Sequence, residues 1–163
     1  MFEVYVLVEK KKSVILSFFS VFSYVMGALS ALAVVLGIYF FVPTAVFGII
    51  LGFFLQTRRY EFEYSYFDGE VRFAKIINKA NRKKLPGYNM AEVIAIAPIG
   101  DASVAQYEKD SKVTVRKLQS GYANRKLFVM VAKGEKGVEL VYFEPDDKYL
   151  DAVCVKYGYK VRR

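Results

Sequence analysis

"TRRYEFEYSYFDGEVRF", residues 57 to 73, carries a regular strand pattern directly after a long uncharged run. An extended chain here would place polar side chains on one face and four aromatic side chains on the other, those of Tyr60, Phe62, Tyr64 and Tyr66. This alternation has the period of a half-buried strand. Asp68-Gly69 follows, and this dipeptide suits a two-residue turn in which both residues take positive φ. The stretch therefore predicts a β-hairpin. Counting back from the turn pairs Tyr66 with Val71 and Tyr64 with Phe73.

The run before the hairpin has no acidic or basic residue from Ser13 to Thr57. A single helix over residues 14–55 would be roughly 63 Å long at about 1.5 Å per residue. A hydrocarbon core is only about 30 Å thick, so the run is long enough for two spans. We predict two transmembrane helices at about residues 13–36 and 40–57, with the break between Gly37 and Pro43.

The charges that flank this run predict its orientation. Three lysines precede the run, Lys10, Lys11 and Lys12, and two arginines follow it, Arg58 and Arg59. The short turn between the two predicted helices has no charged residue. The positive-inside rule then puts both ends in the cytoplasm, with residues 1–12 as a cytoplasmic N-terminal segment and the five basic residues as membrane-interface anchors. A cleaved signal peptide ending near residues 31–33 is the competing interpretation, but the chain stays apolar for another 20-odd residues. The single cysteine, Cys154, agrees with a reducing compartment.

Small residues recur at helical spacing within both predicted spans: Ser23, Gly27 and Ala31 in the first, Gly48 and Gly52 in the second. Such surfaces let helix backbones approach closely. They can pack the two helices of one hairpin or join copies into a homo-oligomer, and the sequence leaves both uses open.

The cytoplasmic part, residues 58–163, shows further strand patterns and two helices. Strands are expected at 70–77, 81–85, 92–99, 112–118, 126–132 and 138–144, with a turn at Asn78-Lys79 and another within 133–137. A short helix capped by Asp101 is expected over 101–110, and a closing helix over about 146–157. We therefore expect an α+β fold, in which a transmembrane helical hairpin precedes a small antiparallel sheet or partly open barrel closed by a C-terminal helix.

This order of elements resembles a known family. The membrane hairpin, "YEFEYSYFDGE", the basic stretch "NKANRKKLPGYNMAEVIAIAP" and "FEPDDKYLDAVCVKYG" look like an uncharacterised family of small two-helix membrane proteins from Gram-positive bacteria. The cytoplasmic part is similar in layout to bacterial pleckstrin-homology-like (PH-like) domains over about residues 60–158. The resemblance implies a PH-like fold, and it brings no established activity or site.

Catalytic chemistry is not expected. The chain has no histidine, which removes the commonest general base and metal ligand. Cys154 falls on the apolar stripe of the closing helix, where a packing thiol is favoured over a nucleophile. Asp146 and Asp147 are read as helix-end charges rather than an acid/base pair or metal ligands. We therefore expect no enzyme activity, no metal and no cofactor.

The formal net charge of +8 points instead to binding. The densest cluster lies near the second turn of the sheet: Lys79, Arg82, Lys83 and Lys84. Three more basic residues, Lys160, Arg162 and Arg163, lie at the tail. The cluster is consistent with a merely solvated turn, with contact to acidic lipid headgroups, or with an acidic protein partner. Nucleic acid is disfavoured, because no aromatic residues interleave with the cluster.

Two functions follow from different classes. The first is a membrane-tethered, non-enzymatic binding or scaffolding module at the inner face of the cell membrane, which contacts acidic lipids or a membrane or cytoplasmic protein. The alternative is a structural subunit of a membrane complex that assembles through its helical hairpin.

Overall fold

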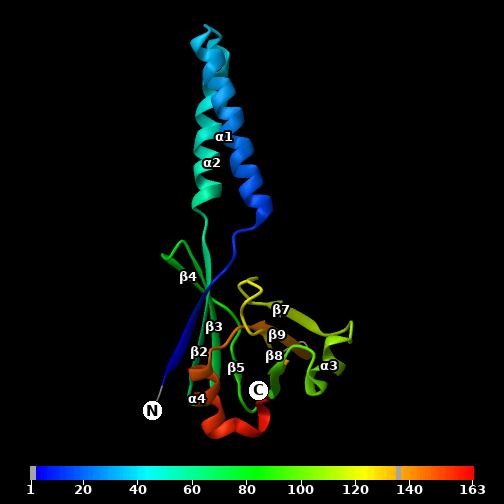
Figure 1. Cartoon of the computed structure of the whole chain (residues 1–163). Helices are drawn as coiled ribbons and strands as arrows, with labels where there is room; N and C mark the ends of the chain where they lie inside the picture. Colours follow the sequence, from blue (N-terminus) through cyan, green and yellow to red (C-terminus); the bar gives the residue numbers. More distant parts are fainter. Residues whose placement is uncertain (1–2, 135–136) are drawn as a thin grey trace. The chain divides into compact units, whose positions relative to one another are not determined.

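The computed structural model describes residues 3–134 and 137–163, which form two compact units. The helical unit is Lys11–Arg59, and the sheet unit comprises the chain up to Lys10 together with Tyr60–Arg163. The helical unit is thus inserted between the first and second strands of the sheet unit (Figure 1).

The helical unit contains α1 (Val14–Val35), the 3-10 helix η1 (Tyr39–Phe41) and α2 (Val42–Thr57). The chain reverses at Gly37, whose φ of +93° lies in the left-handed region that favours glycine. Pro43 lies in the first turn of α2, where its missing N–H costs nothing. Val14–Val35 and Tyr39–Thr57 are each long and apolar enough to cross a membrane, with mean hydropathies of 2.0 and 1.9.

The sheet unit contains two sheets. The first has the order β1-β2-β3-β4, with β5 also beside β3: β1 (Val4–Glu9), β2 (Tyr60–Phe67), β3 (Glu70–Ile77), β4 (Asn81–Lys84) and β5 (Tyr88–Asn89). The second has the order β6-β8-β9-β7: β6 (Val93–Pro98), β7 (Thr114–Lys117), β8 (Phe128–Gly134) and β9 (Gly137–Phe143). The remaining elements are α3 (Ala102–Glu108), α4 (Asp147–Tyr157) and the 3-10 helix η2 (Gly158–Lys160).

The β2–β3 hairpin has the predicted register, in which Tyr66 pairs with Val71 and Tyr64 with Phe73. Both turn residues take positive φ, +43° at Asp68 and +86° at Gly69, as the two-residue turn requires. The predicted turn at Asn78-Lys79 is also formed, with φ of +53° and +57°, although three residues, 78–80, separate the paired residues Ile77 and Asn81. The predicted turn within 133–137 lies largely outside the described residues.

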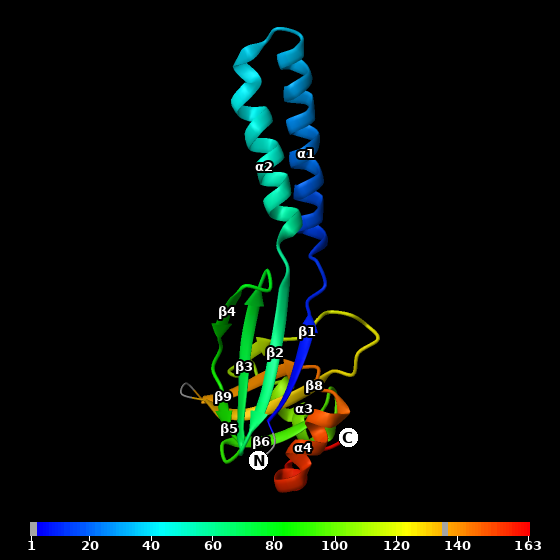
Figure 2. The same cartoon turned by 90° about the vertical axis from the view of Figure 1, so that its left-hand side faces the viewer.

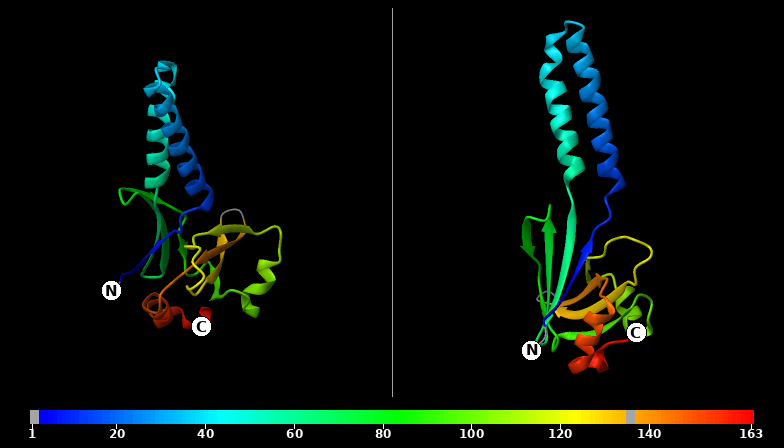
Figure 3. Two further views of the ribbon diagram at one scale, coloured as in Figure 1. Left: turned by 45° about the horizontal axis from the view of Figure 1, so that its top comes forward. Right: turned by 60° about the vertical axis from the view of Figure 1, so that its left-hand side comes forward.

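The core lies between the two sheets and α4 (Figures 2 and 3). Its centre is a group of aromatic rings in edge-to-face contact, with the Phe143 ring centroid 5.7 Å from Tyr64, 6.0 Å from Phe73 and 6.1 Å from Tyr149. α4 adds Leu150 and Val153 to this cluster. Asp146 caps α4 by accepting a hydrogen bond from the Tyr149 N–H, and Asp101 caps α3 in the same way through Ser103.

Three features differ from the expected fold. Residues 1–12 were expected to form a separate segment, but Val4–Glu9 is the edge strand β1, because Val4, Val6 and Val8 alternate onto the core face of β2. The expected antiparallel sheet includes one parallel pair, β7 with β9. The strands form two sheets rather than one small sheet, and among the described residues these two sheets do not join into a closed barrel.

Candidate functional site

The β3–β4 hairpin brings the predicted basic cluster together. Lys79 lies in the turn, and three residues follow on β4, all of them exposed: Arg82, Lys83 and Lys84. The structure adds Lys75, which lies directly opposite Lys83 in the β3–β4 ladder. Sequence reasoning missed Lys75 because only the register between the strands puts it there. We name Lys75, Lys79, Arg82, Lys83 and Lys84 the basic hairpin.

The charges of the basic hairpin surround its tip. Side chains alternate along a strand, so Lys83 and its partner Lys75 point to one side of the sheet, and Arg82 and Lys84 to the other. Arg82 forms an ion pair with Glu63 of β2. The Lys75 ammonium lies 4.1 Å from the centroid of the Tyr60 ring. The arrangement offers several ammonium groups to an anionic surface at the end of the hairpin.

The tip lies at the end of the sheet where the chain leaves for the helical unit. Tyr60, the first residue of β2, pairs with Ile77, the last residue of β3 before the turn. The Lys10 N–H donates to the Tyr60 carbonyl oxygen at 2.8 Å, which holds the end of β1 beside the start of β2. The two chain crossings and the Asn78-Lys79 turn therefore share one end of the first sheet.

Two of the three basic residues at the C-terminus, Lys160 and Arg163, have their charged groups engaged within the chain. The Lys160 ammonium donates to the carbonyl oxygens of Met90 and Val93, both at 2.7 Å, and more distantly to Ala91 at 3.5 Å. The Arg163 guanidinium forms an ion pair with Asp151 at 2.5 Å. Lys160 thus acts as an internal clamp on the loop between β5 and β6.

Replacing Lys160 by methionine should lower the free energy of unfolding by about 1.5 kcal/mol. The change keeps most of the side-chain volume but deletes a charged donor to two well-placed carbonyl groups. Chemical denaturation of the purified chain, followed by circular dichroism, measures the effect. The matched change Arg162→Met, at an exposed side chain that has no hydrogen bond to another described residue, should cost less than about 0.5 kcal/mol. Equal effects of the two changes would contradict the clamp.

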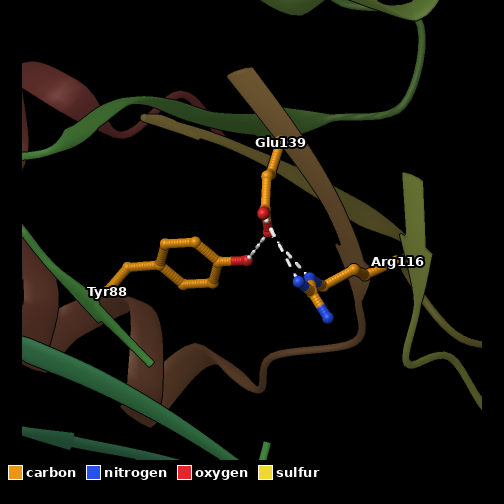
Figure 4. Close-up of polar contacts among 3 residues, drawn as sticks. All are labelled: Tyr88, Arg116 and Glu139. Atoms are coloured by element: carbon orange, nitrogen blue, oxygen red, sulfur yellow. Dashed lines mark hydrogen bonds and ion pairs between the residues drawn. The ribbon is translucent and has the colours of Figure 1, made fainter. Parts of the chain in front are cut away.

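A second polar group links the two sheets (Figure 4). The Glu139 carboxylate on β9 accepts a hydrogen bond from the Tyr88 hydroxyl at 2.5 Å and one from Arg116 Nε on β7 at 2.7 Å. Burial and the hydrogen bond to Glu139 raise the pKa of Tyr88, so its hydroxyl stays a donor. The hydrogen bond to Glu139 likewise raises the pKa of Arg116. A carboxylate held by these two donors is suited to joining the sheets rather than to catalysis.

The other residues that the sequence analysis weighed for chemistry, Cys154, Asp146 and Asp147, lie on or at the start of α4. Cys154 is half-buried on α4, with Arg163 Nη2 3.7 Å from its sulfur atom. Asp146 is the cap of α4, and Asp147 lies in the first turn of that helix. The described part of the chain holds no group of three or more acidic or cysteine side chains that could bind a metal ion.

The small residues of the helical unit face each other across α1 and α2. Gly27 and Gly48 meet so closely that a Cβ atom at Gly48 would lie 3.0 Å from the Gly27 backbone. Ser23 and Gly52 are also buried there, and the Ser20 hydroxyl donates to the Gly52 carbonyl oxygen at 3.0 Å. Ala31 is only half-buried, and the neighbouring Ser30 takes the buried position.

The five predicted membrane-interface anchors lie near the ends of the helices. Lys12 donates to the Gln56 carbonyl oxygen at 3.0 Å, which ties the start of α1 to the end of α2. The Lys10 ammonium lies 5.7 Å from the centroid of the Phe62 ring. The side chains of Lys11, Arg58 and Arg59 are exposed.

Comparison with known proteins identifies a family for the chain. The family model described as "Bacterial PH-like domain (DUF6106)" matches residues 2–163, and so includes β1, both long helices and the whole sheet unit. No curated protein and no solved structure matches the chain.

Proposed function

The chain belongs to the family of bacterial PH-like domains (DUF6106), and on that premise we propose that it is a membrane-tethered binding module. Domains of this kind are generally non-catalytic binding modules, and no feature of an enzyme is seen in the described residues. In this proposal α1 and α2 cross the cell membrane as a hairpin, and the basic hairpin of the sheet unit contacts acidic lipid headgroups at the inner face.

The observation that carries the proposal is the pairing of Lys75 with Lys83. Like charges directly opposite each other in a ladder destabilise a sheet, so a sequence shaped only by stability would avoid them. An anionic surface turns this cost into a gain, since each basic residue near an acidic leaflet contributes about 1 kcal/mol. Lys79 and Lys84 extend the same charged tip.

The short connections support the tether. α2 ends at Thr57 and β2 begins at Tyr60, so only Arg58 and Arg59 lie between them. Two extended residues reach at most about 7 Å, which is no longer than the Debye length of about 8–10 Å at physiological salt. The positive-inside rule, applied to the five anchor residues, favours a cytoplasmic location for both termini.

We expect a cysteine at position 80, beside the turn, to be shielded by acidic lipid. The variant Ala80→Cys, made in a Cys154→Ala background, is reconstituted as the full chain in vesicles with or without about one third anionic lipid. Its reaction with a water-soluble maleimide should slow several-fold when anionic lipid is present, and the difference should vanish at high salt. In inverted membrane vesicles the same cysteine should be accessible from outside, as a cytoplasmic sheet unit requires.

The control variant removes four positive charges outside the basic hairpin. Alanine at Lys79, Arg82, Lys83 and Lys84 should abolish the slowing, whereas alanine at four other exposed lysines should preserve it: Lys109, Lys112, Lys117 and Lys126. Identical reaction rates with neutral and anionic vesicles would refute the lipid contact. Accessibility only in right-side-out vesicles would refute the orientation.

The alternative, a structural subunit assembled through the helical hairpin, has less support. The residues that were candidates for joining copies, Gly27, Gly48 and Gly52, are used in the contact between α1 and α2 of one chain. The outward faces of these helices carry large apolar side chains such as Phe18 and Phe22, which suit lipid.

A further inference from the structure

One edge of the first sheet, formed by β1, is open. The Lys10 N–H donates to the Tyr60 carbonyl oxygen, so Lys10 and Tyr60 form a hydrogen-bonded pair. Hydrogen-bonded and non-hydrogen-bonded pairs alternate along an antiparallel ladder. Tyr5, Leu7 and Glu9 therefore form non-hydrogen-bonded pairs with β2, and they turn their N–H and C=O groups away from it. We name these three residues the β1 edge.

Nothing in the described part of the chain occupies the β1 edge. Among the described residues, only those of β2 form hydrogen bonds with the main chain of β1, and no such bond reaches the main chain of Tyr5, Leu7 or Glu9 from elsewhere. Their side chains are exposed, Tyr5 at 67% and Leu7 at 50%. The register with β2 runs without a bulge from Val4 to Glu9, and the strand contains neither proline nor lysine. Three devices that proteins use to block an edge, proline, lysine and a bulge, are thus missing from Val4–Glu9.

The other described sheet edges have such devices. β4 is four residues long and carries Arg82, Lys83 and Lys84, which disfavour pairing with another strand. β7 is equally short and carries Arg116 and Lys117. β6 ends at Pro98 and is bridged by Val161 near the C-terminus. The contrast singles out β1 as an edge left available for pairing.

A second copy of this chain does not fit as the occupant within one membrane. Two identical strands related by a twofold axis through a sheet run antiparallel, which would put the two Lys10 ends at opposite ends of the pair. Each Lys10 leads within a few residues into α1. If both hairpins enter the same bilayer, the two copies cannot make this contact.

The residues around the β1 edge indicate which side chains a strand that pairs with it would carry. Glu9 lies directly opposite Glu61, and neither carboxylate has an ion-pair partner among the described residues. Exposed apolar Tyr5 and Leu7 lie on the same side of the strand. Beside them is an open hollow of about 370 Å³, lined by Leu7, Glu9, Tyr122, Asn124 and Arg125. A basic residue would neutralise the two glutamates, and an apolar residue would fill the space beside Leu7.

We propose that the β1 edge takes an extended segment of a partner protein as an additional strand, in which basic and apolar residues alternate. Main-chain hydrogen bonds to Tyr5, Leu7 and Glu9 supply affinity, and the side chains beside Leu7 and Glu9 supply selectivity. The inference rests on the proposed role as a binding module and names a partner class for it, on a surface distinct from the basic hairpin.

The test uses a capped ten-residue peptide in which valine and lysine alternate, labelled for fluorescence anisotropy. The full chain in neutral detergent should bind it saturably, and a peptide that alternates valine with glutamate should bind at least tenfold more weakly. Hydrogen exchange should slow on binding within the segment that contains Tyr5, Leu7 and Glu9. Weak binding to both peptides, or equal binding to both, would overturn the proposal.

Two variants locate the contact. Leu7→Pro deletes an N–H that β2 does not use, so the sheet should remain while peptide affinity falls at least tenfold. Glu9→Lys should give a similar loss by charge reversal and keeps the test valid if the proline variant misfolds. Val155→Lys, at an apolar side chain on α4 that is 88% exposed, should bind as the wild type does. Wild-type affinity in both β1 variants, or a dimer of the chain that Leu7→Pro dissociates, would overturn the proposal.

This test and the lipid test fail separately. Alanine at Lys79, Arg82, Lys83 and Lys84 should leave peptide binding in place while lipid shielding is lost. Lipid shielding without peptide binding would remove the β1 inference alone. Peptide binding without lipid shielding would remove the lipid contact alone, and loss of both would remove the binding-module proposal.

Discussion

A chain in which residues 11–59 are replaced by Asn-Gly should fold as a soluble sheet unit, whereas the fragment 58–163 should not fold. Lys10 and Tyr60 form a hydrogen-bonded pair at 2.8 Å, the arrangement that closes a two-residue hairpin. Asn-Gly suits such a turn because both positions need positive φ. The replacement therefore joins β1 to β2 directly and omits the helical unit.

The fragment 58–163 lacks β1 and loses much of the free energy that holds the sheet unit together. Val6 and Val8 are 8% and 0% exposed, and the burial of each valine side chain is worth about 1.5–3 kcal/mol. The six-residue ladder with β2 is lost as well, and the Phe62 and Tyr64 side chains lose part of their cover. Domains are typically stable by only about 5–15 kcal/mol, so the loss removes most of the margin.

Urea denaturation followed by circular dichroism, with a two-dimensional amide spectrum, checks this result. The Asn-Gly chain should unfold cooperatively and show dispersed resonances, and the fragment should show neither. A control with Val8→Asp in the Asn-Gly chain should resemble the fragment, because it buries an unpaired carboxylate at a fully buried position. Cooperative unfolding of 58–163 with a midpoint close to that of the Asn-Gly chain would show that β1 is dispensable.

Gly48→Leu should destabilise the contact between α1 and α2 by about 3 kcal/mol or more. A Cβ atom at Gly48 would lie 3.0 Å from the Gly27 Cα and N atoms and from the Ser23 carbonyl oxygen. All three are backbone atoms, which cannot move aside without separating the helices, and overpacking of this kind typically costs about 1–3 kcal/mol and occasionally more. The measurement is unfolding of the full chain by sodium dodecyl sulfate, followed by helical circular dichroism.

A graded control comes from Gly52 and Ile50. At Gly52 the near atoms belong to the Tyr24 ring, a side chain that can shift, so Gly52→Ala should cost less than about 1 kcal/mol. Ile50 is 50% exposed, and Ile50→Leu should have no effect. If Gly48→Leu leaves the unfolding of the monomer unchanged but dissociates an oligomer in detergent, the structural-subunit alternative is favoured over the binding module.

Local patterns predicted those elements whose partners lie close in the chain. The β2–β3 hairpin needs only the alternation around Tyr64 and the Asp68-Gly69 turn, so its register followed from counting. Asp101 and Asp146 cap their helices with main-chain groups two or three residues away. The charges of Lys79, Arg82, Lys83 and Lys84 were visible as a cluster because they fall within six consecutive residues.

Contacts between distant parts of the chain could not be predicted in this way. β1 was missed because its partner β2 follows only after the apolar helices. Its six residues precede three lysines, so they were interpreted as part of the charged segment that flanks the membrane. Lys160 counted as tail charge because its carbonyl partners lie about 70 residues earlier in the chain. Glu139 and Arg116 gave no signal, since only the parallel β7–β9 pairing brings them together.

The sequence by itself determined the division into apolar helices and a basic sheet unit, the β2–β3 hairpin and the closing helix, because each depends on periodicity or composition within a short segment. Only the tertiary structure decided that the N-terminal residues form an edge strand, that Lys75 faces Lys83, and that Gly27 meets Gly48. These facts depend on register and on the close approach of segments far apart in the chain, which no local pattern encodes.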